Sequence, residues 1–278
     1  MRDEKETLRA VFRRVLRLEN RRVAIRQGRL EHISGFPSAI LGNAREITVY
    51  LPAGYDESGD RRYPVLYMQD GQNLFDPHRA YVPGNHWRIQ EAADAAIGER
   101  TARPMIIVGI DHAGTRRVDE YTPVKDAKHK GGGLAADYAR FVIEELKPAI
   151  DARFRTLPDA ENTAVGGSSL GGLVSLHLAL EHPTVFRRAT VMSPSVWWAD
   201  RAILRDVQAF QGPPPRMWLD VGGREGVETL RDVRDLRDRL VEKGWRDLEF
   251  YEDRRGDHSE RAWARRFRQA LEFLFPPA

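Results

Sequence analysis

The stretch Val165-Gly166-Gly167-Ser168-Ser169-Leu170-Gly171-Gly172 decides the fold that this sequence predicts. At its centre lies a Gly-x-Ser-x-Gly motif around Ser169. A short β-prone run over 163–165 precedes the motif, and an apolar run typical of a buried helix follows over 173–180. A strand, a sharp glycine turn and a helix are the context in which this motif forms a nucleophile elbow. The stretch therefore predicts a serine nucleophile at the end of a buried strand.

Ser169, rather than Ser168, is the predicted nucleophile. On such a strained turn the hydroxyl projects off the edge of the sheet, and side chains two positions away on either side would collide with the turn. Gly167 and Gly171 meet this requirement for Ser169, whereas Leu170 lies at the corresponding position for Ser168. A glycine-rich turn without chemistry and a phosphate-binding loop are other interpretations. No Gly-Lys-Ser/Thr follows, which excludes a P-loop.

The composition of the 278-residue chain fits one large α/β domain or two small ones. Hydrophobic residues make up 41% of the chain, which is enough for a sizeable core. The net charge is only +3 and the basic residues are spread along the chain, so a nucleic-acid partner is not indicated. The absence of cysteine excludes disulfides, thiolate metal sites and a cysteine nucleophile.

The N-terminal segment has no apolar core of the kind found in secretory signals, and no apolar run approaches the roughly 20 residues of a membrane span. We therefore expect a cytoplasmic protein. Apolar residues at helical spacing over 7–18, with arginines on the other face, predict a short amphipathic helix packed on the domain. A membrane-surface helix is the alternative. The expected organisation is a helical extension over 1–21 and a single domain over 22–278.

Alternating strand and helix patterns from 63 to 275 predict one mostly parallel sheet, with helices on both faces and no separate lid domain. Antiparallel strands are expected before it, over 22–27 and 46–51, with turns at Gly28 and Gly35. The strands of the parallel part are expected at 64–68, 104–110, 163–165, 189–193, 217–221 and 248–251.

Two connecting segments stand out between these strands. A helix over 134–154 contains Pro148, which should kink it. The polar loop 111–133 is longer than the usual connection in such folds, and loops of this length are often functional.

A serine nucleophile needs a base that takes its proton, and the base needs a carboxylate that orients it. In hydrolases with this elbow the order along the chain is serine, acid, histidine, so the base is expected after the last strands. Among eight histidines, only His258 follows His182, and it lies in a glycine-containing loop between the last strand and the last helix. His258 is therefore the predicted base. His182, at a helix end, and His177, within the helix after the nucleophile, are expected to be structural.

The orienting acid is expected in the loop after the penultimate strand. Glu225 fits, because it lies in that loop and between Ser169 and His258 along the chain. Asp220 is a rival, but it falls inside the strand. Asp257 is adjacent to His258 in the sequence, so its side chain is poorly placed to reach the far nitrogen of the ring. A carboxylate at a helix N-terminus, favoured by the dipole, is the alternative interpretation of Glu225.

Two backbone N–H groups are expected to hold an oxyanion. One belongs to Leu170, at the start of the helix after the nucleophile, where unpaired N–H groups favour negative charge. The other is expected in the polar stretch 69–76, directly after a buried strand. Asp70 and Asp76 in this stretch could suggest a metal, but no third ligand lies at a recognisable spacing. We therefore expect neither a metal nor a cofactor.

With these residues assembled, the chain resembles the esterase D / enterochelin esterase-like family of α/β-hydrolases, which includes feruloyl, acetylxylan and siderophore esterases and mycolyltransferases. The resemblance covers about residues 30–275 and is specific to the family, but not to one substrate. It rests on motifs that occur in order: Val49-Tyr50-Leu51-Pro52-x-Gly54-Tyr55, Asp70-Gly71-Gln72-Asn73-Leu74-Phe75, Glu120-Tyr121-Thr122-Pro123, Gly167-Ser168-Ser169-Leu170-Gly171-Gly172, Gly222-x-x-Glu225 and Gly256-x-His258.

The resemblance implies an α/β-hydrolase fold, Gln72 as the first oxyanion donor and Glu225 as the acid. The predicted function is a serine carboxylic-ester hydrolase that forms an acyl-enzyme with a small or medium ester. A phenolic or acetyl sugar ester and a siderophore-type ester are the expected kinds of small-molecule substrate. An acyltransferase with the same triad and a catalytically silent interaction protein on the same scaffold are the alternatives. The sequence indicates no oligomeric state.

Arg117, Tyr121 and Trp198 are expected to contact the substrate. They belong to loops that should open onto the same sheet edge as Ser169, and aromatic side chains with arginine suit an aromatic or anionic acyl group. Packing in the core is the alternative for Trp198, and an ion pair with Glu120 is the alternative for Arg117.

Overall fold

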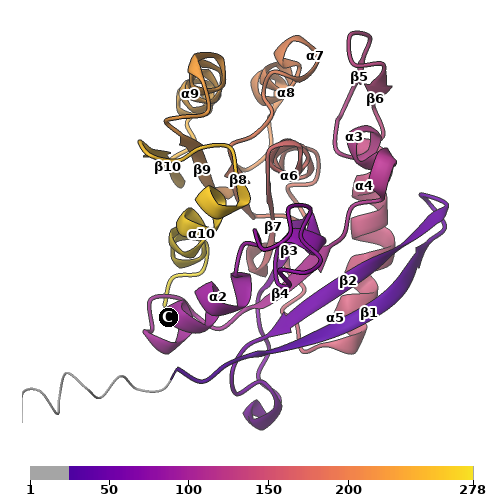
Figure 1. Cartoon of the computed structure of the whole chain (residues 1–278), viewed down its shortest axis with the longest axis vertical. Helices are drawn as coiled ribbons and strands as arrows, with labels where there is room; N and C mark the ends of the chain where they lie inside the picture. The colour runs from indigo at the N-terminus through magenta and orange to yellow at the C-terminus, as the bar shows by residue number, and fades with distance from the viewer. Residues whose placement is uncertain (1–24, 278) are drawn as a thin grey trace, which may run out of the picture.

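A mostly parallel sheet of eight strands organises the computed structural model, which describes residues 25–277 (Figure 1). The strand order is β1-β2-β4-β3-β7-β8-β9-β10. β2 pairs antiparallel with β1 and with β4, and all other neighbours in this sheet are parallel. The predicted α/β class, with antiparallel strands before parallel ones, is confirmed. The helix expected within 1–21 lies outside the described residues.

The strands alternate their side chains between two helical layers. Their bounds are β1 Arg29–Ser38, β2 Asn43–Leu51, β3 Val65–Gln69, β4 Ile106–Ile110, β7 Thr163–Ser168, β8 Arg188–Met192, β9 Arg216–Gly222 and β10 Leu248–Asp253, with β5 Lys125–Asp126 and β6 Gly131–Gly132 in a separate hairpin. In β3, Val65 and Tyr67 join one hydrophobic cluster, and Leu66 and Met68 join the other. This is the pattern of a strand that is covered on both faces.

Helices cover both faces of the sheet (Figure 1). α2 and α10 pack together on one face, and α4, α5, α6, α8 and α9 lie on the other. The helices are α2 Ile89–Gly98, α3 Arg117–Glu120, α4 Ala135–Arg140, α5 Lys147–Arg153, α6 Leu170–Glu181, α7 Trp198–Arg201, α8 Ile203–Ala209, α9 Val227–Glu242 and α10 Glu260–Leu274, with 3₁₀ turns at Asp56–Ser58, Gly71–Asn73, Gly114–Arg116 and Ala160–Asn162. Over residues 25–277, none of the helices has the length and apolar character needed to cross a membrane.

The first antiparallel strand begins at Arg29, later than the predicted range 22–27, of which residues 25–27 are irregular. Gly28 explains the difference, because a Cβ atom there would lie 2.4 Å from the carbonyl oxygen of Leu51. The chain therefore passes too close to β2 for a side chain just before pairing starts. Gly35 does not end the strand as expected. It has a φ of 62° and lies at a bulge through which β1 continues.

The helix predicted over 134–154 consists of three segments. α4 ends at Arg140, residues 141–146 form a π-helical stretch, and α5 begins at Lys147. Pro148 lies in the first turn of α5, directly after this stretch, and has no N–H group to donate to the carbonyls of the preceding turn. The proline is thus accommodated by a wider helical stretch directly before it.

The polar loop 111–133 contains α3 and the β5–β6 hairpin rather than irregular chain alone. Glu120, at the end of α3, is fully buried and pairs with buried Arg45 of β2 at 3.1 Å. Asn43 donates a further hydrogen bond to the same carboxylate. These contacts tie the loop to the sheet and hold its first turn beside the carboxyl ends of the parallel strands.

Candidate active site

Ser169 lies on a strained turn between β7 and α6, with φ 56° and ψ −122°. A Cβ atom at Gly167 would lie 2.8 Å from the carbonyl carbon of Gly171. A Cβ atom at Gly171 would lie 3.1 Å from Cβ of Gln69 and 3.0 Å from a carboxylate oxygen of Asp70. A side chain at Gly167 would therefore collide with the turn, and one at Gly171 would crowd Gln69 and Asp70, in the sense that the sequence motif predicts. The turn presents the Ser169 side chain to the cleft described below.

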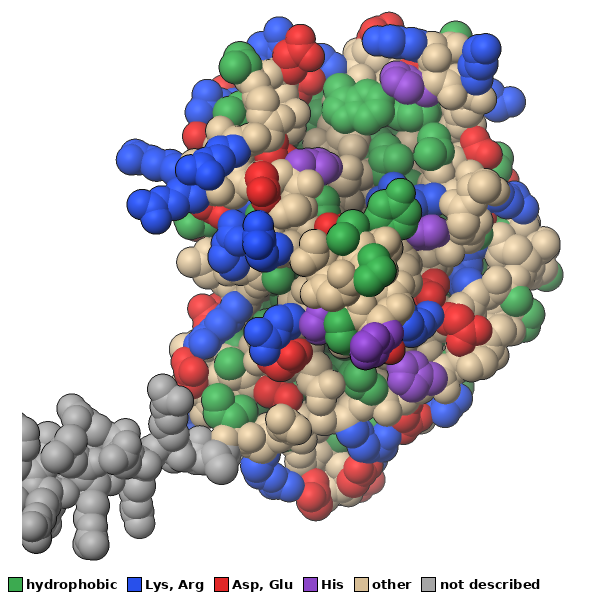
Figure 2. Space-filling view, in the orientation of Figure 1, with side chains coloured by type: hydrophobic (Ala, Val, Ile, Leu, Met, Phe, Trp, Pro, Cys, Tyr) green, Lys and Arg blue, Asp and Glu red, His purple; other side chains and the backbone are tan. Residues whose placement is uncertain are grey.

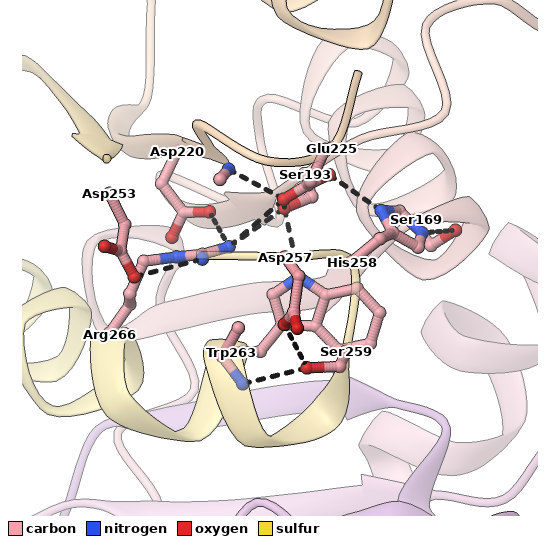
Figure 3. A network of polar contacts seen from close by, with 12 residues as sticks. Ser169, Ser193, Asp220, Glu225, Asp253, Asp257, His258, Ser259, Trp263 and Arg266 are labelled. Atoms are coloured by element: carbon pink, nitrogen blue, oxygen red, sulfur yellow. Dashed lines mark hydrogen bonds and ion pairs between the residues drawn. The ribbon is translucent and has the colours of Figure 1, made fainter. Parts of the chain in front are cut away.

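His258 links the hydroxyl of Ser169 to the carboxylate of Glu225 (Figure 3). Its Nε2 atom lies 3.0 Å from Oγ of Ser169, and its Nδ1 atom lies 2.7 Å from Oε2 of Glu225. The three residues follow β7, β9 and β10, so they meet at the carboxyl edge of the parallel sheet. The structure thus brings together the three residues that the sequence predicts as nucleophile, base and acid.

Glu225 is held as a carboxylate. Its side chain is fully buried, and its Oε1 atom accepts hydrogen bonds from Oγ of Ser193 at 2.6 Å and from the N–H of Gly222 at 2.7 Å. Burial opposes the charged form, but the hydrogen bonds from His258 and Ser193, with the charge of His258 and the Gly222 amide, leave the pKa of Glu225 below its usual value.

The two rival carboxylates point elsewhere. Asp220 is fully buried on β9 and accepts hydrogen bonds from Nε1 of Trp218 at 2.8 Å and Nη2 of Arg266 at 2.9 Å. Its burial raises its pKa, an effect that Arg266 opposes. Asp257 accepts a hydrogen bond from the hydroxyl of Ser259. Within residues 25–277, Glu225 is the carboxylate in contact with the His258 ring.

Gln72 and Leu170 begin short helical segments on either side of Ser169. Gln72 lies in the 3₁₀ turn Gly71–Asn73 after β3, and Leu170 is the first residue of α6. The first N–H groups of a helix lack partners within it. Gln72 and Ser169 line the same cleft, which has a volume of about 560 Å³. Gln72 thus lies in a turn that lines the cleft with Ser169, and Leu170 directly follows Ser169 at the N-terminus of α6.

Asp70, just before Gln72, adopts a left-handed conformation with φ 57°. Its carboxylate accepts two hydrogen bonds from Arg117, from Nε at 2.7 Å and Nη2 at 2.8 Å. The backbone N–H of Asp70 donates to the hydroxyl of Tyr121 at 3.3 Å. Arg117 therefore pairs with Asp70 rather than with Glu120, and it supports the loop that carries Gln72.

The three residues expected to contact substrate differ in their exposure to the cleft. Arg117 lines the cleft but is engaged by Asp70. Tyr121 is fully buried, and Trp198 is 2% exposed with its Nε1 donating to the carbonyl of Val124. Tyr121 and Trp198 are buried and support neighbouring loops. Tyr121 accepts a hydrogen bond from the backbone of Asp70, and Trp198 donates one to the backbone of Val124.

Exposed apolar side chains form a rim beside the cleft. Tyr81, Val82 and Val118 line it beside Ser169, and Tyr81 is 80% exposed. Trp197 is 44% exposed and borders a second hollow of about 720 Å³, which shares no lining residue with the cleft of Ser169. Figure 2 shows hydrophobic side chains gathered at the centre and upper part of this face, with Lys and Arg side chains towards its margins. No sequence motif marks these positions, because exposure of single apolar residues depends on the fold.

The second hollow is lined by aromatic and charged side chains. The His129 ring lies 5.1 Å from the ring of Trp197 and 5.4 Å from that of Trp198. Lys125 and Lys128 of the hairpin also line the hollow. In the described part of the chain, no group of three or more histidine or carboxylate side chains is placed to hold a metal ion.

Comparison with known proteins identifies the family. A family model described as "Putative esterase" matches residues 38–274. The chain belongs to this esterase family. The resemblance to esterase D and enterochelin esterases is thereby confirmed, and so is the prediction that the chain is a carboxylic ester hydrolase.

Relatives with assigned activities include siderophore esterases. The chain is 27% identical to the iron(III) salmochelin esterase of Escherichia coli over 74% of this chain and 48% of the relative. It is 29% identical to the ferri-bacillibactin esterase BesA of Bacillus subtilis over 64% of this chain and 67% of the relative. The chain thus spans about half the length of the salmochelin esterase. An uncharacterized Bacillus subtilis protein, YbbA, is 25% identical and is matched over 92% of its length.

Solved structures support the fold. A ferulic acid esterase superposes with a TM-score of 0.71 at 19% identity, covering 90% of this chain and 98% of that chain. An enterobactin esterase from Shigella flexneri superposes with a TM-score of 0.72 at 22% identity, covering 91% of this chain and 61% of that chain.

Proposed function

We propose that this esterase cleaves its substrate through an acyl-enzyme on Ser169. His258 takes the proton of the Ser169 hydroxyl as its oxygen attacks the acyl carbon, and the imidazolium then protonates the leaving alcohol. Water, deprotonated by the same ring, releases the acid and restores the serine. The observation that supports this most directly is the 3.0 Å distance between Nε2 of His258 and Oγ of Ser169.

Glu225 holds the imidazole in the tautomer that the reaction requires. Its contact with Nδ1 at 2.7 Å places the ring proton on that nitrogen and leaves Nε2 as the acceptor. The lowered pKa of Glu225 keeps the carboxylate ionised at neutral pH, so its charge faces the imidazolium when this forms. We assign the oxyanion to the backbone N–H groups of Gln72 and Leu170, each worth about 10²–10³ in rate.

The substrate that we propose is a small or medium ester with an aromatic or anionic part, such as a phenolic-acid or siderophore-type ester. The names of the relatives favour it, and so do the aromatic and basic side chains that line the second hollow. Trp197 and His129 offer aromatic surface, and Lys125, Lys128 and Arg205 offer positive charge beside the carboxylates of Asp126, Asp200 and Glu228. An acetyl sugar ester is the smaller alternative.

Turnover of p-nitrophenyl acetate tests the assignment of the nucleophile. Ser169→Ala should abolish turnover and keep the melting temperature, because the hydroxyl is replaced on an unchanged turn. Ser168→Ala is the matched control, since Ser168 is adjacent and lines the same cleft. Retained turnover in Ser169→Ala would refute the proposal. Adding sugar or alcohol acceptors to the wild-type assay reveals transfer products if the enzyme is an acyltransferase.

The domain division and the location stay proposals. We propose a single esterase domain over 22–278 with a helical extension over 1–21, in a cytoplasmic protein. Removal of residues 1–21 should leave turnover of p-nitrophenyl acetate unchanged, and loss of turnover would contradict this division.

A further inference from the structure

A buried polar network surrounds Oε1 of Glu225, and one of its members, Trp263, also packs edge-on against the His258 ring at 4.9 Å between ring centres (Figure 3). It consists of Ser193 directly after β8, Asp220 on β9, and Trp263 and Arg266 on α10. Ser193 and Asp220 are 0% exposed and Arg266 is 1% exposed. Burying a charged guanidinium is costly unless its partners are well placed, so this arrangement calls for an explanation.

The hydroxyl of Ser193 can donate in one direction only. Its oxygen accepts the Nε1–H group of Trp263 at 3.0 Å and an Nη2–H group of Arg266 at 2.9 Å. Indole and guanidinium nitrogens donate and do not accept. The single hydroxyl proton must therefore point at Oε1 of Glu225, which lies 2.6 Å away.

This donor distinguishes the two oxygens of Glu225. Oε1 accepts from Ser193 and from the amide of Gly222, and Oε2 is left for Nδ1 of His258. Rotation of the carboxylate would break two short hydrogen bonds in a site without solvent. The carboxylate plane is thus fixed in the orientation that meets the ring.

Asp220 keeps the buried guanidinium from pairing closely with the catalytic acid. Nη2 of Arg266 lies 2.9 Å from Oδ1 of Asp220 but 3.8 Å from Oε1 of Glu225. A close ion pair would match the charge of Glu225 before the reaction begins. Arg266 is thus shared between Asp220, at the shorter distance, and Glu225, so one negative charge of the two carboxylates remains to be matched by the imidazolium, which forms only during the reaction.

The backbone at Ser193 indicates that its side chain is needed. Ser193 has a φ of 42°, in the left-handed region that favours glycine. Its backbone N–H donates to the carbonyl of Asp220 at 2.9 Å, which holds this strained conformation. A serine at such a position pays a conformational cost that glycine would avoid.

We propose that Ser193 is a positioning residue that orients Glu225 for His258. Trp263 and Arg266 set the direction of its hydroxyl. This role rests on the triad proposed above, because Ser193 touches neither the substrate nor the nucleophile and acts through Glu225.

Ser193→Ala and Ser193→Gly test the proposal together. Both remove the hydroxyl, so kcat for p-nitrophenyl acetate should fall about 10- to 100-fold in each, the effect of one charge-assisted hydrogen bond, with KM little changed. If Ser193 served only the turn, Ser193→Gly would keep the wild-type kcat. The matched control is Ser38→Ala, which removes a buried serine at the end of β1 that donates to Glu145 of the π-helical stretch at 2.5 Å. This control should keep the wild-type kcat.

A double-mutant cycle separates positioning from structural damage. In a Glu225→Gln background, Ser193→Ala should lower kcat by less than about twofold, because the hydroxyl acts through the carboxylate. Equal losses in both backgrounds, or a wild-type kcat in Ser193→Ala beside an impaired Glu225→Gln, would overturn the role of Ser193 and leave the triad standing. A wild-type kcat in Glu225→Gln would overturn the triad and this role with it.

Discussion

Two carboxylates of low exposure flank the candidate nucleophile, and the protein treats their charges differently. Asp70, before the oxyanion loop, receives both of its strong hydrogen bonds from one guanidinium, that of Arg117. Glu225 receives a hydroxyl, an amide and the ring of His258, while the guanidinium of Arg266 stays 3.8 Å away.

The difference separates a structural charge from a chemical one. The charge of Asp70 is matched at all times, so it can fix a loop but cannot respond to the reaction. Glu225 accepts its short hydrogen bonds from the neutral donors Ser193 and Gly222 and has only a longer ion pair with Arg266, and in the proposed mechanism it gains a full counter-charge when the imidazolium forms. Interactions that strengthen in the transition state raise kcat, whereas constant ones only position groups.

The largest effect is expected for Glu225→Gln. An amide cannot fix the tautomer of His258 or face its positive charge, so kcat should fall about 10³–10⁴-fold in p-nitrophenyl acetate assays. Asp257→Asn is the control, because Asp257 adjoins His258 in sequence but bonds Ser259. If Asp257→Asn proved the more damaging change, the assignment of the acid would be wrong.

A smaller effect is expected at the structural pair. Asp70→Asn and Arg117→Met should each lower kcat about 10- to 100-fold, because either change leaves a charge unpaired and frees the oxyanion loop. The double variant should be less impaired than the product of the two single losses. A rise in KM with unchanged kcat in Arg117→Met would show instead that Arg117 binds substrate, as the sequence suggested.

The exposed rim should affect binding rather than chemistry. Trp197→Ala is expected to raise KM for methyl ferulate about 5- to 10-fold, the worth of one aromatic contact, and to leave p-nitrophenyl acetate kcat unchanged. Trp197→Phe keeps an aromatic ring and should lie close to wild type. Equal KM values for all three enzymes would remove Trp197 from the substrate site.

The effect expected at Asp111 is on stability and not on activity. Burial, opposed by Arg79, raises the pKa of Asp111 to about 6, against about 3.9 in an unfolded chain. The folded state thus binds more protons between these values, and stability from this group is lost as pH rises from about 4 to 6. Asp111→Asn should therefore gain on the order of 2–3 kcal/mol relative to wild type between pH 4 and pH 7 in urea unfolding. An equal difference at both pH values would contradict this.

The candidate catalytic centre could be predicted from the sequence because local packing and strand order constrain it. Close packing at the turn demands glycine on both sides of Ser169, and the order of the strands leaves Glu225 and His258 at the same sheet edge. The alternation of strands and helices likewise depends on local patterns. These features need little knowledge of distant contacts.

The exposure of the rim residues and the polar network around Glu225 could not be predicted from such local patterns. Trp197 and Trp198 are adjacent, and only the short helix α7 decides that the first is exposed and the second buried. Arg266 did leave a signal, because it lies on the apolar stripe of α10 with Trp263 and Phe267. Its partners lie at Ser193, directly after β8, and at Asp220 of β9, so no local pattern indicates what Arg266 binds.

Covalent labelling tests directly whether Ser169 is the nucleophile. The purified protein is treated with a fluorophosphonate, digested and analysed by mass spectrometry. We expect one adduct, on Ser169 of the digested peptide. This adduct should be retained in Ser168→Ala and lost in Ser169→Ala. An adduct on Ser168, or ester turnover that persists with Ser169 unlabelled, would contradict it.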